Sequence, residues 1–577
     1  MWISIDYLSA LLTLGVAFGK HAIWNVFVRF WPGFERPIIE VQQGRVQGVT
    51  AKLPNGSRYH FFKGIPYARS PVGDLRFRAP VRLERFTKTL LNCSTDKGDF
   101  IQNHVVFDWP IIGSEKELYL NVYTPALPKK DSNKYPVMVY IHGGAYKYGT
   151  VSSLIYDPEY LIQQGVVVVT FIYRLGPLGF LCLPNAGISG NAGLKDQRLV
   201  LQWVHENIEQ FGGDTDNVTL FGESAGSWST YLHYLSPNSR KYFHRVICQS
   251  GDSCTESAFQ VDPEGKARKL ARLLGCTGDS DEDVLDTLMK APASALVKYQ
   301  DDVIGPDEEG CFHRFLFKPV IEQQSTEDSI ITRTPEEIMK SFDTLDMPIM
   351  SGCTSGEGML ALTLSKYRLE DYNRHPEWLL PRFIGQTKNL EQKIGIGQEV
   401  KNFYLGGNNI SWEAINQTCD LMSDVTFVVS SNLSAEWIAK FQPNVKHYNY
   451  NFSFNGRFDL LKKLYNIGSV NGVCHGDDIF YLFSPSFLPT LPTDSNECKV
   501  RDVFVKVITN FAKFGDPTPG GSMLGFAWEP IQPFDRSSEH FNLRCLEITQ
   551  SPRMLQNPNQ DRMEFWRKVI TKHTNLL

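Results

Sequence analysis

The sequence predicts an α/β fold in which a central, mostly parallel, twisted sheet is flanked by helices. Two continuous apolar runs rich in β-branched residues contain or end in glycine: YPVMVYIHGG at 135–144 and GVVVVTFIYRLGPLGF at 165–180. Such runs are typical of strands that are buried on both faces of a sheet. The next segment, GLKDQRLVLQWVHENIEQFGG at 193–213, has the apolar spacing of a helix and ends in glycines. Together these strand and helix patterns predict the α/β class.

Further strands are predicted along the rest of the chain. They are NVTLFGESAG at 217–226, RVICQSG at 245–251, MPIMSG at 347–352 and HYNYNFSF at 447–454. Longer helical and loop segments separate them, and we expect these segments to form insertions above the sheet.

Composition limits the number of domains and the kind of ligand. With 577 residues, 42% of them hydrophobic, the chain can bury a large core as one domain or as two fused lobes. The sequence contains neither an internal repeat nor a low-complexity linker, so we predict a single domain over 39–577. A net charge of −5 without a long basic run argues against a nucleic-acid surface and favours a small-molecule ligand. The eleven cysteines have no metal-binding spacing, and their odd number leaves at least one thiol free within a single chain.

Residues 1–38 form a separate hydrophobic and aromatic segment. YLSALLTLGVAFG, at 7–19, is short for a bilayer span and suits the apolar region of a signal peptide. However, no lysine or arginine precedes it, Lys20 and Arg29 follow, and a second apolar stretch, AIWNVFVRFW, occupies 22–31. Three interpretations therefore stay open: a cleaved signal, a membrane-surface anchor, or a helix packed on the body.

A serine between two glycines directly follows one of the predicted strands. In LFGESAGSWST, Gly222 and Gly226 leave room for a tight strand-to-helix turn from which Ser224 would project above the sheet. The first amides of the next helix, from about Ala225, would point to the same place and could stabilise an oxyanion. A serine that only caps a helix would need neither glycine. The pattern indicates a nucleophilic serine.

A serine nucleophile needs a base, and the order expected in this class of fold is serine, acid, histidine. His475 lies in NGVCHGDDIF, a loop after the 447–454 strand, and this placement suits a histidine that a loop delivers to a site on a rigid sheet. A loop histidine can also be merely solvated. His447 lies within the strand and is expected to be structural.

An acid must hold the histidine in the correct tautomer. Glu357 lies in a glycine-rich turn just beyond the 347–352 strand, where a sheet strand is expected to end. Asp477 and Asp478 are nearer to His475 in sequence, but they would more naturally begin the next helix, where negative charge is favourable. Glu357 is therefore the predicted acid.

A second glycine-rich turn follows the 135–141 strand. YIHGGAYKYG places His142, Gly143, Gly144 and Ala145 in succession, so consecutive backbone N–H groups can converge on one point. This turn is the predicted oxyanion hole.

At this point the motifs carry a resemblance to a known family. HGGAY, GESAG, SGEG and GVCHGDD, with FKGIPYARSPVGDLRFRAP, ELYLNVYTP and GNAGLKDQRLVLQWV, are similar to the carboxylesterase and cholinesterase family of α/β hydrolases. The insect α-esterase branch looks most similar, and the resemblance covers about 39–577. It implies an α/β-hydrolase fold with helical insertions that form a gorge. The site roles that it implies are Ser224 as nucleophile, His475 as base and then acid, Glu357 as orienting carboxylate, and the amides of Gly144, Ala145 and Ala225 as oxyanion hole.

The sequence departs from the family pattern in three places. The family motif SEDCLYLN reads SEKELYLN here, so Glu117 replaces a cysteine and its disulfide with Cys93 cannot form, which weakens the case for an oxidising compartment. Ala145 stands where many members have a third glycine, and its methyl group could crowd a bulky acyl or phosphoryl group. Leu360 and Ala361 replace aromatic residues, which predicts a roomier pocket and argues against a quaternary ammonium substrate. With Tyr156, they are the expected pocket residues.

The expected activity is hydrolysis of small to medium hydrophobic esters, xenobiotic or lipid, through an acyl-enzyme that organophosphates would trap. This chemistry needs no cofactor. Two alternatives are a catalytically silent cell-adhesion or binding relative and a dedicated hormone-ester or lipid-ester hydrolase. The expected partner is a small ester, with no nucleic acid, and we expect a monomer or weak dimer. An intracellular protein, with a possible attachment to membrane or lipid through residues 1–38, is favoured over a secreted one.

Overall fold

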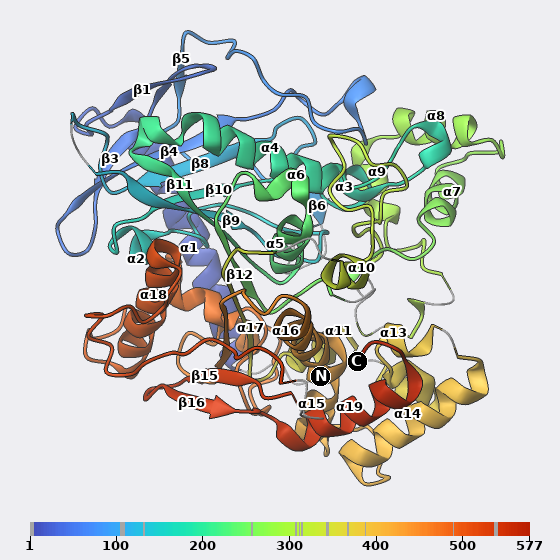
Figure 1. The fold of residues 1–577 in the computed structure, drawn as a ribbon. Coiled ribbons are helices and arrows are strands. Elements are labelled where there is room, and N and C mark those ends of the chain that lie inside the picture. Colours follow the sequence, from blue (N-terminus) through green and yellow to red (C-terminus); the bar gives the residue numbers. More distant parts are fainter. Residues whose placement is uncertain are drawn as a thin grey trace.

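One long sheet runs through the molecule and organises the fold (Figure 1). In the described residues it has eleven strands, in the order β16-β15-β14-β13-β12-β11-β9-β10-β8-β4-β3. Neighbours from β15 to β10 are parallel, and antiparallel pairs complete both ends. The predicted α/β fold with a mostly parallel sheet is therefore confirmed.

The structure is a computed structural model. It describes all residues except 1–4, 104–109, 131–132, 255–257, 306–307, 311, 313–314, 342–344, 366–367, 387, 489 and 536–540.

The strands of the large sheet are short and buried at its centre. In sheet order they are β16 (Arg553–Gln556), β15 (Arg544–Ile548), β14 (His447–Phe452), β13 (Ile349–Thr354), β12 (Arg245–Gln249), β11 (Gly213–Glu223), β9 (Tyr135–Ile141), β10 (Val167–Phe171), β8 (Tyr119–Thr124), β4 (Arg58–Pro66) and β3 (Val49–Lys52). Two smaller sheets contain β1 (Ile38–Val41), β2 (Gly44–Gln47) and β5 (Leu90–Asn92), and β6 (Gln102–Asn103) and β7 (Ile111–Ile112).

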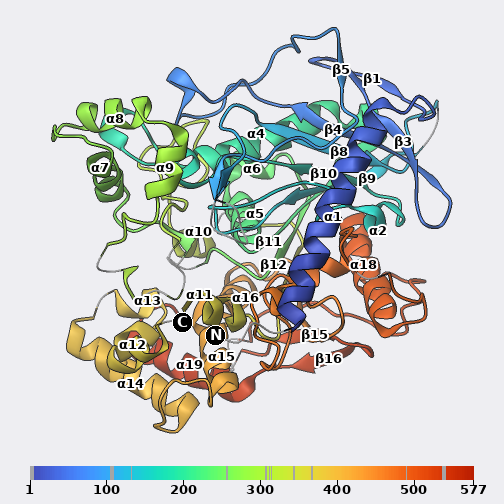
Figure 2. The same ribbon diagram turned by 180° about the vertical axis from the view of Figure 1, so that it is seen from behind.

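Helices connect the strands and cover the sheet (Figures 1 and 2). Those of the first half are α1 (Ile5–Phe30), α2 (Glu159–Ile162), α3 (Gly176–Phe180), α4 (Ala192–Asn207), α5 (Ala225–Leu235), α6 (Pro237–Arg240), α7 (Pro263–Leu273), α8 (Asp281–Lys290) and α9 (Ala293–Tyr299). Those of the second half are α10 (Pro335–Lys340), α11 (Gly358–Ser365), α12 (Leu369–Arg374), α13 (Arg382–Gly385), α14 (Leu390–Leu405), α15 (Ile415–Ser423), α16 (Val429–Phe441), α17 (Leu460–Leu464), α18 (Asn496–Phe514) and α19 (Gln560–His573). As expected, α7 to α10 and α11 to α16 are insertions, after β12 and after β13.

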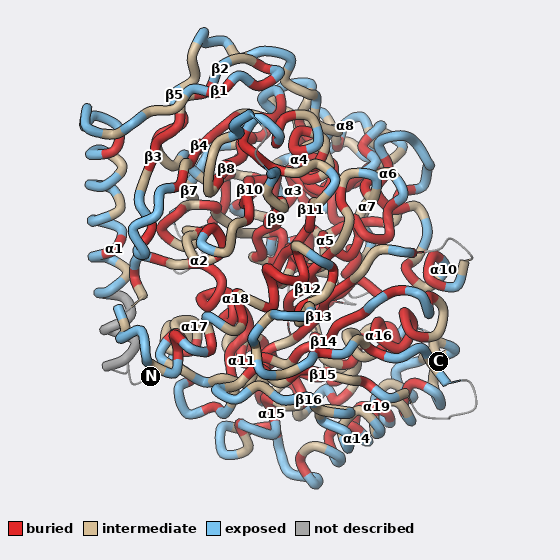
Figure 3. Tube along the Cα trace, turned by 60° about the vertical axis from the view of Figure 1, so that its left-hand side comes forward, coloured by how far each residue is buried: buried red, intermediate tan, exposed pale blue. Residues whose placement is uncertain are grey.

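Alternate residues of the central strands face two hydrophobic cores. Val139 of β9 belongs to the core that contains Leu201 of α4 and Leu232 of α5. Its neighbour Tyr140 belongs to the opposite core, which contains Phe504 of α18. Since successive side chains of a strand point to opposite faces, a continuous apolar run can fill both cores at once. Figure 3 shows the buried residues along this sheet, with exposed residues on the outer turns.

The N-terminal segment forms α1, which lies obliquely across one side of the molecule (Figure 2). Ala17 and Val28 of this helix are buried in the core shared with α18. Within the described part of the chain, no helix combines the length and apolar character that crossing a membrane requires.

None of the ten described cysteines is paired, and Cys311 lies outside the described residues. Cys93 is buried and free, and burial raises the pKa of its thiol to about 12.

The start of α5 approaches the end of β9 so closely that a side chain would not fit. A Cβ on Gly226 would lie 2.0 Å from the Ile141 carbonyl oxygen, and a Cβ on Gly222 would lie 2.5 Å from the Gly226 carbonyl carbon. Both distances are far below van der Waals contact with backbone that cannot easily move. These two glycines therefore allow α5 to pack directly on β9.

We expect Gly226→Ala to lower the midpoint of thermal unfolding by a few degrees, because overpacking against backbone costs about 1–3 kcal/mol. Gly395→Ala is the matched control, since Gly395 is exposed in α14 and its Cβ would meet nothing within 4 Å. That substitution should stabilise the protein by up to about 1 kcal/mol. Equal midpoints for the two variants, measured by calorimetry, would contradict the close approach.

Candidate active site

Ser224 lies on a strained turn between β11 and α5. Its backbone angles are φ 56° and ψ −123°, a conformation that costs a residue with a Cβ about 1–3 kcal/mol. Two hydrogen bonds hold the turn: the Ser224 N–H donates to the Gln249 carbonyl and the Trp228 N–H donates to the Ser224 carbonyl, both at 2.9 Å. The serine is therefore fixed at the carboxyl end of the central strand.

The structure brings His475 and Glu357 together, although they are 118 residues apart in the chain. His475 Nδ1 lies 2.5 Å from Glu357 Oε2. The Glu357 side chain is fully buried, and its other oxygen accepts hydrogen bonds from the Ser250 hydroxyl at 2.6 Å and the Thr354 N–H at 2.7 Å. A carboxylate held by three donors can orient an imidazole ring.

The two loops that carry these residues are joined to each other. Gly356 and Cys474, each next to one of the two residues, form a parallel β-bridge. The Val473 N–H donates to the Ser355 hydroxyl at 3.1 Å. The sequence placed both residues in loops after strands, and this bridge sets the spacing between them.

The other nitrogen of His475 faces a second carboxylate. Its Nε2 lies 3.1 Å from Oε1 of Glu223, the residue before Ser224. Among the described residues no hydrogen bond joins the Ser224 hydroxyl to His475, and such contacts often tighten only when a substrate is bound. Phe427 stacks on the imidazole with ring centroids 4.6 Å apart.

Three buried carboxylates determine the charge balance around His475. Burial lowers the pKa of His475, but Glu357 and Glu223 together outweigh it and raise that pKa above its usual value. Burial raises the pKa of Glu223, despite the opposing effect of His475. Burial and the Glu357 charge also raise the pKa of Asp478 to about 6, and its Oδ2 accepts from Gln249 Nε2 at 3.1 Å. The site thus favours an imidazolium cation.

As the sequence predicted, Asp477 and Asp478 begin the next helical turn, the 3-10 helix η8 (Asp477–Tyr481). Neither carboxylate is solvated, however. Asp477 accepts from the Leu461 N–H at 3.0 Å and Asp478 also accepts from the Tyr450 hydroxyl at 3.3 Å. His447 is buried against the Ser351 hydroxyl at 2.7 Å, on the neighbouring strand.

The predicted oxyanion turn lies beside Ser224. A Cβ on Gly143 would lie 3.1 Å from the Ser224 Cβ. Gly144, Ala145 and Tyr146 all have positive φ, at 103°, 61° and 58°. In the described hydrogen bonds, the N–H groups of Gly144, Ala145 and Ala225 donate to no acceptor. They remain available to a ligand.

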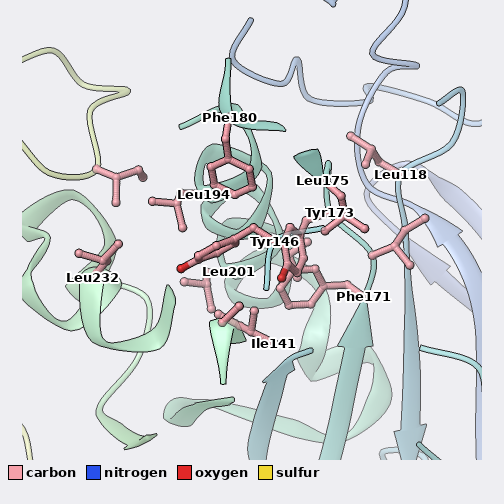
Figure 4. Packing of buried hydrophobic residues seen from close by; sticks show 14 of the residues in the cluster. Leu118, Ile141, Tyr146, Phe171, Tyr173, Leu175, Phe180, Leu194, Leu201 and Leu232 are labelled. Carbon is pink, nitrogen blue, oxygen red and sulfur yellow. The ribbon is translucent and has the colours of Figure 1, made fainter. Parts of the chain in front are cut away.

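Packing behind the turn maintains its strained backbone. The Tyr173 hydroxyl donates to the His142 carbonyl at 2.9 Å, and the two rings stack 4.4 Å apart. The Tyr146 ring lies 4.7 Å from Phe180, and the Gly176 N–H donates to the Tyr146 carbonyl at 2.7 Å. Figure 4 shows Tyr146 and Tyr173 surrounded by this buried apolar group.

A cavity of about 510 Å³ adjoins the site. Trp228, one turn beyond Ser224, lines it together with Val425 and Thr426, which precede Phe427. The remaining wall is mixed: Phe312, Phe315, Trp378 and Leu380 are apolar, and Glu308, Lys318, Glu377, Arg382 and Lys393 are charged.

None of the three expected pocket residues is among the described residues that line this cavity. Tyr156 packs against Tyr140 and Phe483, with ring centroids 5.2 and 5.3 Å away. Leu360 is half-buried on α11. Ala361 is fully buried in a third hydrophobic core, which leaves its methyl group no surface for a ligand.

Three residues that contact His475 or Glu357 were not predicted from the sequence: Glu223, Ser250 and Phe427. Glu223 and Ser250 stand at the ends of predicted strands, so their positions at the edge of the sheet were accessible from the pattern. Phe427 lies in an inserted helical segment, where the local sequence gives no signal of its contact with His475.

Residues 35–566 match the Carboxylesterase family. The chain belongs to the carboxylesterase family. It is thus a carboxylic ester hydrolase, as the resemblance predicted. The insect α-esterase branch stays a prediction.

Insect esterases are among the relatives of this carboxylesterase. Juvenile hormone esterase of Tribolium castaneum is 34% identical over 518 residues, which cover 84% of each chain. Esterase B1 of Culex pipiens is 32% identical over 540 residues, which cover 92% of this chain and 97% of the relative. The solved structure of juvenile hormone esterase from Manduca sexta, with OTFP covalently attached, covers 93% of this chain and 100% of its own with a TM-score of 0.80. At 24% identity that structure supports the fold, the α/β-hydrolase fold.

A buried ion pair connects the C-terminal helix of the esterase to the segment that carries Phe427. Asp424 is fully buried in the π-helical segment η7 (Asp424–Val428) and lies 3.0 Å from Arg562 Nε of α19. The Tyr404 hydroxyl also donates to Asp424. Burial raises the pKa of Asp424 to about 7, against the lowering effect of Arg562. The cation therefore compensates a carboxylate that is otherwise costly to bury.

We expect Glu223→Gln to shift the acidic limb of the kcat/KM profile of the esterase to lower pH. Glu223 helps to raise the pKa of His475, and activity should appear as the imidazole loses its proton on raising the pH. Without that charge the neutral base would form at lower pH. The measurement is kcat/KM for a neutral ester across pH, with Glu391→Gln, at an exposed position of α14, as control. If the acidic limb of the kcat/KM profile lies at the same pH in the variant, Glu223 does not raise the pKa of His475.

We expect Arg562→Met to destabilise the esterase by about 3–5 kcal/mol, because it leaves the Asp424 charge buried and uncompensated. Adding Asp424→Asn should restore part of the loss. Arg553→Met is the control, since Arg553 is 70% exposed in its pair with Glu547 and exposed pairs contribute at most about 1 kcal/mol. The measurement is the midpoint of thermal unfolding of each variant. Equal decreases for Arg562→Met and Arg553→Met would argue against a stabilising role of the buried pair.

Proposed function

We propose that this esterase hydrolyses carboxylic esters by two-step acyl transfer through Ser224, His475 and Glu357. The observation that carries the proposal is that the three residues lie at one edge of the sheet. Ser224 is held on a strained turn beside Gly143, while the separate His475–Glu357 contact is buried at the same edge of the sheet. A half-buried serine on a strained turn near a buried acid–imidazole pair is typical of a nucleophile with its base.

In the first step the Ser224 oxygen attacks the ester carbonyl carbon while His475 Nε2 takes the hydroxyl proton. The buried Glu357 carboxylate stabilises the imidazolium that forms, and its contact with Nδ1 fixes the tautomer. The raised pKa of His475 favours this cation. His475 then donates the proton to the alcohol oxygen as the carbon–oxygen bond of the ester breaks, which leaves the acyl-enzyme.

In the second step water repeats the sequence. His475 takes a proton from the water as its oxygen attacks the acyl carbon, and returns a proton to the Ser224 oxygen as the carboxylic acid leaves. In both steps the N–H groups of Gly144, Ala145 and Ala225 donate to the negative oxygen of the tetrahedral intermediate. Each donor of this kind is worth about 3–4 kcal/mol in the transition state.

The adjoining cavity supports hydrophobic esters of small to medium size as substrates. Its volume of about 510 Å³ lies within the range of sites for drug-sized ligands, and indole and phenyl rings line it together with charged side chains. The proposed substrate class is therefore a hydrophobic xenobiotic or lipid ester.

A dedicated hormone-ester hydrolase is the second candidate. The supporting observation is that a relative of 34% identity over 84% of the chain bears the name juvenile hormone esterase. Rates for that hormone against simple naphthyl esters of matched acyl length separate the two candidates. A preference for the hormone of at least about a hundredfold in kcat/KM, near 2.7 kcal/mol of transition-state binding, would favour the dedicated enzyme.

The decisive experiment is titration of the purified protein with a reactive organophosphate, followed by intact mass and peptide mapping. We expect one adduct per chain on Ser224, with a parallel loss of ester hydrolysis. A phosphorylated serine oxygen can no longer attack an ester, and the phosphoryl-serine is hydrolysed slowly. Ser224→Ala should abolish both labelling and turnover, with a loss in kcat of about 10⁴ or more.

Ser227→Ala is the matched control on the same helix. Its hydroxyl donates to the Gly251 carbonyl and plays no part in the proposed chemistry, so labelling should persist. Turnover by folded Ser224→Ala protein, or an adduct on another residue, would refute the assignment.

A further inference from the structure

Helix α1 buries one narrow face and exposes the opposite one. Ala17 and Val28 are 3% and 1% exposed, and Leu14 and His21 are partly buried beside them. These four positions recur at the spacing of one helical face. The packed face therefore uses only a single stripe of the helix.

Polar contacts hold α1 in this orientation. His21 Nε2 lies 3.1 Å from Asp96 Oδ2, which is itself paired with Lys63 at 3.0 Å. At the other end, the Arg36 guanidinium donates to the Val28 carbonyl at 2.6 Å and to the Arg29 carbonyl at 3.3 Å, which caps the last turn. The outer face is thus presented in a fixed direction.

That outer face is apolar. Leu12, Ile23 and Phe30 are 71%, 71% and 72% exposed, and Val16 and Val26 between them are 58% and 60% exposed. At about 100° per residue these five positions lie on the side of the helix opposite Ala17 and Val28. Figures 2 and 3 show α1 at the surface, with exposed turns along its outer side. A continuous exposed apolar stripe marks an interaction surface, whereas single exposed side chains do not.

The charges beside the stripe are positive. Lys20 and Arg29 are exposed and flank it on its two sides, and the sequence contains no aspartate or glutamate from 7 to 34. Cations on both sides of an exposed apolar face suit the boundary between acyl chains and anionic headgroups.

We infer that the outer face of α1 binds the surface of an anionic lipid membrane, with the helix lying in the plane of the interface. A second copy of the chain fits this face less well, because two such faces would bring Lys20 and Arg29 of each copy together and like charges at an interface are unfavourable. The binding is independent of the ester chemistry proposed above.

The experiment is co-sedimentation of the full-length protein with vesicles of phosphatidylcholine alone and of phosphatidylcholine with phosphatidylserine in a ratio of about 7:3. We expect the protein to sediment with the mixed vesicles and much less with phosphatidylcholine alone. Intact mass of the same preparation verifies that residues 1–38 are present.

The test variant is Ile23→Glu, Val26→Glu and Phe30→Glu combined, and its partition onto mixed vesicles should fall at least about tenfold. The matched control is Trp412→Glu, Phe514→Glu and Met523→Glu combined, which makes the same charge change at three exposed apolar residues outside α1. The control should bind like the unchanged protein.

A second variant tests the charges: Lys20→Gln with Arg29→Gln should remove the preference for phosphatidylserine. Hydrolysis of a soluble naphthyl ester verifies the fold of every variant.

Four outcomes would overturn the inference. The unchanged protein could stay in the supernatant with both kinds of vesicle, or both triple variants could bind equally well. Light scattering could show a dimer that the α1 variant dissociates, which would assign the face to a second copy. Finally, the mature protein from its own cells could lack residues 1–19, which would identify the segment as a cleaved signal.

Discussion

The arrangement of the site depends on the close approach of two backbone segments, 141–143 and 224–226, at the carboxyl end of the central sheet. Gly226 at the start of α5 lies against Ile141 at the end of β9, and Gly143 lies against Ser224. Only backbone fits in these contacts, so the strand that leads into the serine and the strand that leads into the oxyanion turn are held in a fixed relation. Ser224 and Ala145 both have a positive φ in these turns. Strain of this kind persists because the rigid parallel strands on either side over-determine the turn.

Environment distinguishes carboxylates that have the same chemistry. Glu357 receives hydrogen bonds from Ser250 and Thr354 besides its contact with His475, so its charge is well solvated by the protein. Glu223 faces the same imidazole, but burial raises its pKa. A hydrogen-bonded carboxylate suits a permanent partner of the imidazolium, whereas a poorly solvated one responds to the charge state of its neighbours. The imidazole thus lies between two carboxylates in different surroundings: hydrogen-bond donors surround Glu357, and burial raises the pKa of Glu223.

Elements far from the reacting atoms are connected to the site through buried polar contacts. Arg562 of the C-terminal helix neutralises Asp424, and three residues later in the same π-helical segment Phe427 covers the imidazole. The His21–Asp96 contact holds the N-terminal helix to the body, Arg36 caps its last turn, and its exposed apolar face is directed outward. Polar contacts thus fix α1 and α19, while the sheet supplies the rigid frame.

The sequence by itself determined the strands and the glycine-rich turns, and it predicted Ser224, His475 and Glu357 as the residues of the site. Apolar runs and glycines predicted β9 to β14, because burial on two faces and tight turns impose residue types locally. The tertiary structure decided which side chains meet: His475 and Glu357 are 118 residues apart, and a β-bridge between their loops sets their separation. It also buried Ala361 in the third hydrophobic core, and it brought Phe427 onto the imidazole from an insertion without a local signal. The physical reason is that backbone preferences are local, whereas burial, pKa and the shape of a cavity sum over segments that are distant in the chain.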